Sequence, residues 1–157
     1  MFTVSRTLDV NDSTATEPTL TRGHVWRGLV MKAEDAVPFV GAMERCTVVE
    51  RGEGWLVRDI LLRGEEMRER VTFEPENRVT FERVRSSTMG TILNEIVEDA
   101  DGVLRLRFTF SLEADGVAPG SAEEKHFAER MADSYLDAVN TTLAAIRALV
   151  GRGDLPA

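Results

Sequence analysis

The feature that most limits the fold is a series of short alternating segments followed by one long amphipathic segment. Residues Phe2 to Val10 alternate apolar and polar side chains, which is typical of a half-buried strand. Short turns rich in Gly, Pro, Asn and Asp separate the later runs, and connections this short join antiparallel neighbours. Six such runs follow: Glu44 to Glu50, Gly54 to Leu62, Met67 to Phe73, Arg78 to Arg85, Thr91 to Glu98 and Val103 to Glu113. The sequence therefore predicts seven antiparallel strands.

A short helix is predicted between the first strand and the other six. Thr21 is its expected N-cap, because apolar residues recur at helical spacing from Val25 to Val30. Pro38 then interrupts the regular pattern, which predicts a further turn before the main sheet.

A much longer helix is predicted at the end of the chain. Ser121 to Glu124 has the pattern of a capping box, in which the serine oxygen accepts the N3 amide hydrogen and Glu124 reaches back. About 30 residues at 1.5 Å each span about 45 Å, which is enough to cross the sheet. A sheet with one apolar face must be covered, so we expect an α+β domain with a curved sheet around this helix. The apolar stripe of the helix, which ends at Gly151, consists of Phe127, Met131, Tyr135, Ala138, Thr142, Ile146 and Leu149.

Charge and composition exclude several classes of partner. The chain has a formal net charge of −8, a pI near 4.9 and basic residues scattered among acidic ones. Nucleic-acid binding and electrostatic membrane anchoring both need clustered Lys and Arg, so we expect neither nucleic acid nor membrane insertion. There is no apolar run of about 18 residues and no signal-peptide pattern. The single cysteine, Cys46, lies in a strand-like run, so we expect a cytoplasmic protein with an inert core thiol.

Several catalytic classes lack their residues. His24 and His126 each lie near the start of a helix among polar residues, and no His, Cys and carboxylate cluster has metal-ligand spacing. The chain has no Gly-rich phosphate loop and no Gly-x-Ser-x-Gly motif. We therefore expect no metal, no cofactor and no nucleophilic hydrolysis.

Two charged residues are predicted to point into the apolar interior. If Arg63-Gly64 is a two-residue hairpin turn, Arg58 stands opposite Glu69, and each shares its face with apolar residues. A three-residue loop would reverse the parity and substitute Asp59 for Arg58. Burying two ions is costly, so the pair is either well hydrogen-bonded or next to a wet cavity. The sequence leaves a structural role and a ligand-contacting role equally open.

An amide on the sixth strand is a further candidate ligand contact. Alternation alone does not decide whether Asn94 or Glu95 points inward. A three-residue loop at 100–102 with Gly102 left-handed would place Asn94 across from Phe108 on the inner face, which favours Asn94. Its amide could bind a ligand carbonyl or hydroxyl, or satisfy neighbouring protein groups. Met131 and Tyr135 of the long helix are expected to form cavity wall.

Motifs along nearly the whole chain resemble the AtaL-like branch of the SRPBCC superfamily, which includes START proteins and birch-pollen allergens. The resemblance implies a helix-grip fold with a seven-stranded curved antiparallel sheet around the C-terminal helix and a hydrophobic cavity inside. It implies one domain over residues 1–151 and a tail over 152–157. The motifs that carry it are Thr21 to Leu29, Pro38-Phe39-Val40, Cys46, Gly64, Arg70 to Pro75, Asn94-Glu95-Ile96, Asp101 to Leu104, Asn140-Thr141-Thr142 and Ile146-Arg147.

Three functional hypotheses follow from the residues and the resemblance. The first is a carrier or sensor that binds a small hydrophobic or aromatic molecule, lipid- or polyketide-like, in an internal cavity. The second is a polyketide cyclase or aromatase-like tailoring enzyme, and the third is a packed structural or partner-binding module. The sequence leaves open whether a reaction is catalysed and whether the chain forms a homodimer. The candidate ligand-binding residues are Arg58, Glu69, Asn94, Phe108, Met131 and Tyr135.

Overall fold

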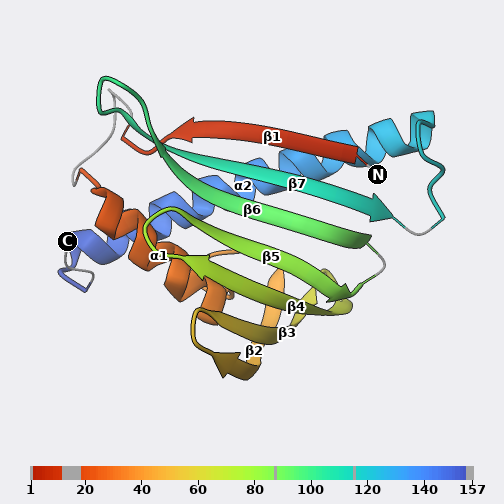
Figure 1. Ribbon diagram of the computed structural model, residues 1–157, viewed down its shortest axis with the longest axis horizontal. Helices are drawn as coiled ribbons and strands as arrows, with labels where there is room; N and C mark the ends of the chain where they lie inside the picture. The colour runs from red at the N-terminus through yellow and green to blue at the C-terminus, as the bar shows by residue number, and fades with distance from the viewer. Residues whose placement is uncertain (1, 12–18, 87, 115, 155–157) are drawn as a thin grey trace.

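The computed structural model describes residues 2–11, 19–86, 88–114 and 116–154. The seven strands form one antiparallel sheet in the order β1-β7-β6-β5-β4-β3-β2 (Figure 1). The elements are β1 (Phe2–Asp9), α1 (Arg22–Glu34), β2 (Met43–Gly52), β3 (Trp55–Leu62), β4 (Glu65–Glu74), β5 (Arg78–Arg85), β6 (Thr88–Glu98), β7 (Leu104–Ala114) and α2 (Ala122–Gly151).

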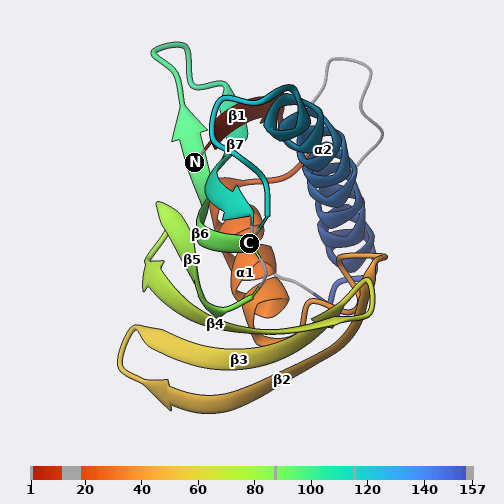
Figure 2. The same cartoon turned by 90° about the vertical axis from the view of Figure 1, so that its right-hand side faces the viewer.

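The sheet is strongly curved, and both helices lie on its concave side (Figure 2). The 30-residue helix α2 runs along the sheet and packs on β1, and α1 lies between one part of α2 and the strands β2, β5 and β6. This arrangement confirms the predicted α+β helix-grip fold. Within the described residues, no helix is long and apolar enough to cross a membrane.

Strand β6 begins earlier than the sequence suggested, at Thr88 rather than Thr91. In the sequence Gly90 resembles a turn residue between two strands, but it lies within the strand with φ of 138°. A Cβ atom added at Gly90 would approach the carbonyl oxygen of Ser111 to 2.0 Å. The glycine is therefore required by the close approach of β7, and the prediction that it belongs to a loop was wrong.

Both predicted N-caps are present, with one difference in detail. Thr21 Oγ1 accepts the amide hydrogen of His24, and the Thr21 amide donates to His24 Nδ1. Ser121 Oγ likewise accepts the amide hydrogen of Glu124 at 3.1 Å. The predicted return contact of Glu124 is shifted by one residue, because its carboxylate accepts from the Gly120 amide. The Ser121 amide is already bonded to the carbonyl of the preceding turn.

The two helices approach each other closely at a glycine. A Cβ atom at Gly28 of α1 would lie 2.3 Å from Cγ1 and Cδ1 of Ile146 of α2. Ile146 is fully buried and belongs to the main apolar core. Because the absence of a side chain at Gly28 admits Ile146, this contact helps to fix how α1 is rotated against the sheet.

Candidate functional site

A cavity of about 490 Å³ lies between the concave face of the sheet and α2. It is lined by strands β3 to β6, by α2, by Lys32 of α1 and by the segment that follows α1. Most of the wall is apolar, but several buried polar side chains also line it. The apolar wall includes Ile60, Met67, Phe81, Ile92, Phe127 and Met131.

Arg58 and Glu69 form a buried ion pair at this cavity, as the hairpin register predicts. Arg63 and Gly64 both have positive φ, and this two-residue turn pairs Arg58 of β3 with Glu69 of β4. Nε and Nη2 of Arg58 donate to Oε1 of Glu69 at 3.0 and 2.8 Å. Both side chains are almost fully buried, so the carboxylate compensates a guanidinium that water does not reach.

Arg58 also caps the C-terminus of α1. Its Nη1 donates to the carbonyl oxygens of Lys32 and Ala33, each at 3.0 Å, and lies 3.7 Å from Sγ of Cys46. The last carbonyls of a helix lack intrahelical partners and carry partial negative charge, which a guanidinium stabilises. These contacts give Arg58 a structural role that joins the sheet to α1. The inert role predicted for the half-buried thiol of Cys46 stays a prediction.

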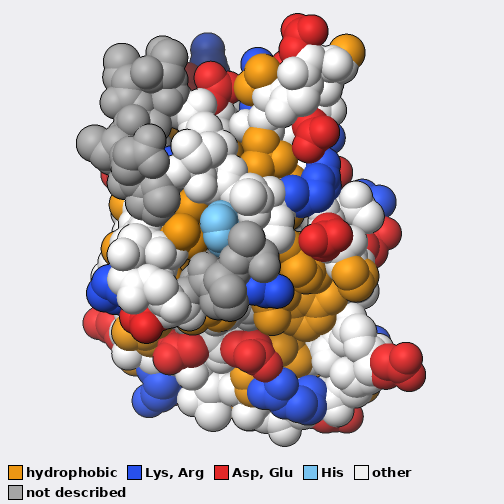
Figure 3. Space-filling view, turned by 90° about the vertical axis from the view of Figure 1, so that its left-hand side faces the viewer, with side chains coloured by type: hydrophobic (Ala, Val, Ile, Leu, Met, Phe, Trp, Pro, Cys, Tyr) orange, Lys and Arg blue, Asp and Glu red, His pale blue; other side chains and the backbone are white. Residues whose placement is uncertain are grey.

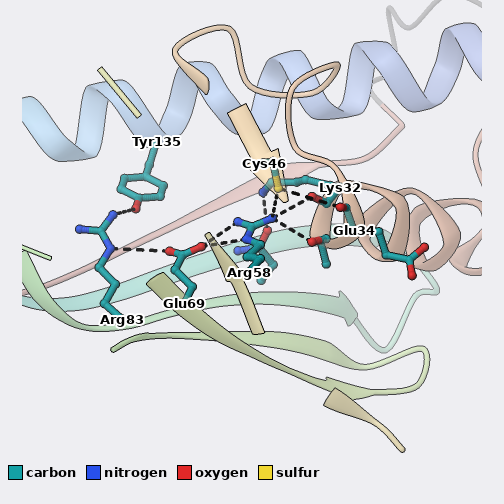
Figure 4. Close-up of polar contacts among 9 residues, drawn as sticks. Lys32, Glu34, Cys46, Arg58, Glu69, Arg83 and Tyr135 are labelled. Atoms are coloured by element: carbon teal, nitrogen blue, oxygen red, sulfur yellow. Dashed lines mark hydrogen bonds and ion pairs between the residues drawn. The ribbon is translucent and has the colours of Figure 1, made fainter. Parts of the chain in front are cut away.

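The network continues from Glu69 to α2 (Figure 4). Oε2 of Glu69 lies 3.7 Å from Nε of Arg83 on β5, and Nη2 of Arg83 donates to the hydroxyl of Tyr135 at 3.2 Å. Burial raises the pKa of Tyr135, so this side chain is a neutral phenol at neutral pH. Glu69 therefore lies between two guanidinium groups.

Lys32 and Asn94 are two further polar residues of the cavity. We call these two residues, together with Arg58, Glu69, Arg83 and Tyr135, the polar wall. Nζ of Lys32 donates to Oδ1 of Asn94 at 2.9 Å and lies 5.7 Å from the ring centre of Phe81. Burial, and then the charge of Arg58, lower the pKa of Lys32 to about 8, although the Glu69 carboxylate opposes this shift. Lys32 can therefore exchange a proton near neutral pH.

The structure brings most of the candidate residues together, and their role in ligand binding stays a prediction. Arg58, Glu69, Asn94, Met131 and Tyr135 all line the cavity, and the predicted register of Asn94 opposite Phe108 is confirmed. The backbone of Gly102 is left-handed, as that register required. Phe108 is absent from the cavity lining. It is fully buried, and its ring stacks on that of Tyr135 with centres 6.1 Å apart.

Among the lining residues that were missed are two cations that interact with the candidate residues, Lys32 and Arg83, and the sequence carries a signal for each. Lys32 lies seven residues after Val25 and three after Leu29, so it falls on the buried stripe of α1. Arg83 continues the inward alternation of Val79 and Phe81 along β5. A charged residue at a position that the apolar periodicity of a helix or strand predicts to be buried is a candidate site residue.

The wall has the groups for proton transfer and for hydrogen bonding to a ligand. Lys32 can act as an acid or a base, and Tyr135 can donate a hydrogen bond. Among the described residues, no group of three or more His, Cys, Asp or Glu side chains is placed to hold a metal ion.

Solved structures share this architecture. The Zhui aromatase/cyclase from Streptomyces sp. R1128 has a TM-score of 0.63 and 17% identity, over 96% of this chain and 94% of that chain. The di-domain ARO/CYC StfQ from the steffimycin biosynthetic pathway has a TM-score of 0.70 and 13% identity, over 95% of this chain and 52% of that chain. Ara h 8.0201 has a TM-score of 0.57 and 13% identity, over 95% of this chain and 97% of that chain. Identities this low show a shared fold only.

A family model gives a more specific match. No curated protein sequence matches the chain significantly. The model described as AtaL, acetylaranotin biosynthesis cluster protein L, matches residues 4–153, which include every residue of the polar wall. The match confirms the resemblance seen in the sequence motifs, and the chain belongs to the AtaL family.

Proposed function

We propose that the protein binds a small hydrophobic or aromatic molecule, lipid- or polyketide-like, in the cavity beneath α2. The observation that carries this proposal is the cavity of about 490 Å³. Its walls are mainly apolar, and a set of polar side chains extends across one wall from Lys32 to Tyr135. Ligand sites in proteins have volumes of about 300 to 1,000 Å³ and combine apolar walls with a few placed polar groups. A cavity of this size argues against the packed structural module.

The apolar and the polar residues of the cavity would make different contacts with a ligand. Met67, Phe81 and Met131 offer apolar surface, and methionine side chains adapt to ligands of irregular shape. Lys32 and Tyr135 offer hydrogen-bond donors to a carbonyl or hydroxyl of the ligand. Two structural neighbours are described as aromatase/cyclases, which supports a ligand of polyketide type.

The test is a titration with the neutral fluorescent probe N-phenyl-1-naphthylamine. We expect saturable binding of one probe per chain and strong loss of binding in Met131→Trp, because the indole fills the cavity. Met89→Trp is the matched control, since Met89 is 40% exposed on β6 and does not line the cavity. Native mass spectrometry of the purified protein would identify any co-purifying molecule. No binding of the probe, or equal binding by both variants, would contradict the proposal.

A second candidate function is cyclisation of a poly-β-keto chain, as in a cyclase or aromatase-like tailoring enzyme. The neutral amine of Lys32 would remove a proton from a carbon between two carbonyls, and the resulting enolate would attack a third carbonyl. The phenol of Tyr135 would donate a hydrogen bond to the alkoxide, the Lys32 ammonium would return the proton, and loss of water would follow. The presence of an amine with a pKa of about 8 at the cavity favours this chemistry.

Turnover separates the two functions. A poly-β-keto thioester of N-acetylcysteamine would be incubated with the protein, and cyclised product would be followed by absorbance and mass spectrometry. If the protein is an enzyme, we expect Tyr135→Phe to slow product formation at least tenfold while binding of N-phenyl-1-naphthylamine is retained. Product formation no faster than in buffer would leave binding as the function.

A further inference from the structure

The buried part of the cavity wall carries an excess of positive charge. Among the described residues, the buried guanidinium groups of Arg58 and Arg83 and the amino group of the half-buried Lys32 face one buried carboxylate, that of Glu69. The excess is therefore two positive charges when Lys32 is protonated. Arg63, Glu65 and Asp137 also line the cavity, and when they are included the wall keeps a net charge of one positive charge. Arg63 and Asp137 are exposed, so water and salt screen their charges most strongly.

This excess contrasts with the rest of the molecule. The chain as a whole has a formal net charge of −8. On the face shown in Figure 3, acidic and basic side chains are interspersed with hydrophobic ones and no single sign prevails. The positive interior is thus a local feature of the cavity, and it does not follow from the composition of the chain.

Within this wall, Lys32 is the cation that the protein compensates least. In the part of the chain that the structure describes, its amino group bonds to the neutral acceptor Oδ1 of Asn94 and to no carboxylate. Glu69, by contrast, is shared between Arg58 and Arg83. Lys32 is half-buried, but its amino group is desolvated. A desolvated ammonium without a paired anion is costly, so it loses its proton or acquires an anionic partner.

We propose that the cavity selects ligands in which an apolar or aromatic body carries one negatively charged group, a carboxylate, phenolate or enolate, that binds Lys32. The proposal rests on the proposed function, since it needs the same cavity, and adds the charge of the ligand. The anion would complete the hydrogen bonding of the ammonium group beside Asn94. The apolar body would lie against Phe81 and the methionines of the wall.

This mode of binding depends on pH with a definite sign. The anion binds the protonated amine, so affinity is highest below the pKa of Lys32, about 8, and falls above it. Between pH 7 and pH 9 the protonated fraction falls roughly tenfold, and the affinity falls with it. The charged groups that act on Lys32 are Arg58 of β3 and Glu69 of β4. Beyond them, Cys46 of β2 lies beside Arg58, Arg83 of β5 lies beside Glu69, and Tyr135 of α2 is bonded to Arg83.

The experiment compares two probes of nearly the same shape, anthracene-2-carboxylate and anthracene-2-carboxamide, by their own fluorescence. At pH 7 we expect the carboxylate to bind the wild-type protein at least tenfold more tightly than the amide. Its affinity should fall roughly tenfold between pH 7 and pH 9, whereas that of the amide should change much less, because the neutral amine can still donate a hydrogen bond to its carbonyl. The carboxylate remains ionised throughout this range, so the change reports on the protein.

Two variants of Lys32 identify the group responsible. Lys32→Met should remove the preference for the carboxylate, so that the carboxylate binds this variant no more tightly than the amide does. Lys32→Arg should keep the preference and remove the pH dependence, because arginine stays charged at pH 9. A pH dependence that persists in Lys32→Arg would assign it to another group and overturn the proposal.

The failure of this proposal can be distinguished from failure of the proposed function. Equal binding of both anthracenes, or tighter binding of the amide, would overturn anion selection and leave cavity binding intact. If neither anthracene binds but N-phenyl-1-naphthylamine does, anion selection is again overturned. If none of the three probes binds, the cavity-binding function and the proposal fail together.

Discussion

Arg58 and Glu69 face each other across the β3–β4 hairpin at 2.8 Å, and neither side chain is more than 4% exposed. One register position further along the hairpin, Asp59 and Arg68 form an ion pair on the opposite, partly exposed face. The same hairpin therefore presents a buried and a solvent-exposed version of the same interaction.

Glu69→Gln is expected to lower the free energy of unfolding by about 3 kcal/mol, because it leaves the buried charges of Arg58 and Arg83 uncompensated. Urea denaturation at pH 7 measures this loss. Asp59→Asn is the matched control, and its effect should be much smaller, since water and salt screen the pair with Arg68. Comparable losses in the two variants would show that burial of the Arg58–Glu69 pair carries no special cost.

The stability of the protein should rise with pH above 8 because of Lys32. Its pKa is about 8 in the folded protein and near 10.5 in the unfolded chain, so the unfolded state binds more protons between these values. Relative to its value at low pH, the free energy of unfolding gains nothing from Lys32 below pH 8. The gain grows between pH 8 and pH 10.5 and reaches about 3 kcal/mol at most.

Urea denaturation of the wild type and of Lys32→Met at pH 7, 8, 9 and 10 isolates this contribution. The difference in unfolding free energy, wild type minus variant, should increase from pH 8 to pH 10. Contributions of other groups, including Tyr135, cancel in the difference to first order. A constant difference across this range would mean that Lys32 has an ordinary pKa in the folded protein.

Gly28→Ala is expected to destabilise the protein by about 1 to 3 kcal/mol, because the new Cβ meets the buried side chain of Ile146. The effect should change sign in an Ile146→Ala background. There the methyl group has room, and alanine is favoured over glycine in a helix by about 1 kcal/mol. Gly41→Ala serves as the control, since nothing lies within 4 Å of its added Cβ. Thermal or urea unfolding of the four variants would decide this, and destabilisation in both backgrounds would contradict it.

Tyr135→Phe is expected to cost about 1 kcal/mol of stability, which is the typical contribution of one hydrogen bond, here from Nη2 of Arg83. The ring contacts with Phe108 and Phe110 would be retained. Urea denaturation measures the change and shows whether the variant is folded enough for the turnover experiment. A loss above about 3 kcal/mol would mean that the hydroxyl also organises the rest of the polar wall.

Turn chemistry explains why part of the site could be predicted from the sequence. The Arg63-Gly64 turn fixes Arg58 opposite Glu69, and the left-handed Gly102 fixes Asn94 opposite Phe108. Since strand side chains alternate strictly, one correct register places every residue of the hairpin on its face. These placements depend on local geometry alone.

Long-range packing explains why the rest of the site could not be predicted from the sequence. The orientation of Lys32 depends on how α1 is rotated, and the contact between Gly28 and Ile146, 118 positions apart in the printed sequence, helps to set that rotation. Phe108 points inward as predicted, but the ring of Tyr135 from α2 stacks on it, and Tyr135 rather than Phe108 lines the cavity. No alternation pattern records which inward-facing side chains of the sheet the helix covers.

Tyr135 is the single tyrosine of the chain, and it stands in the cavity wall. Selective isotope labelling of tyrosine would therefore give one NMR resonance set that reports on the interior of the cavity without any engineered label. A ligand that enters beneath α2 would displace the resonances of this ring, and a ligand that binds only to the outer surface would leave them in place. The protein thus carries its own spectroscopic reporter of occupancy.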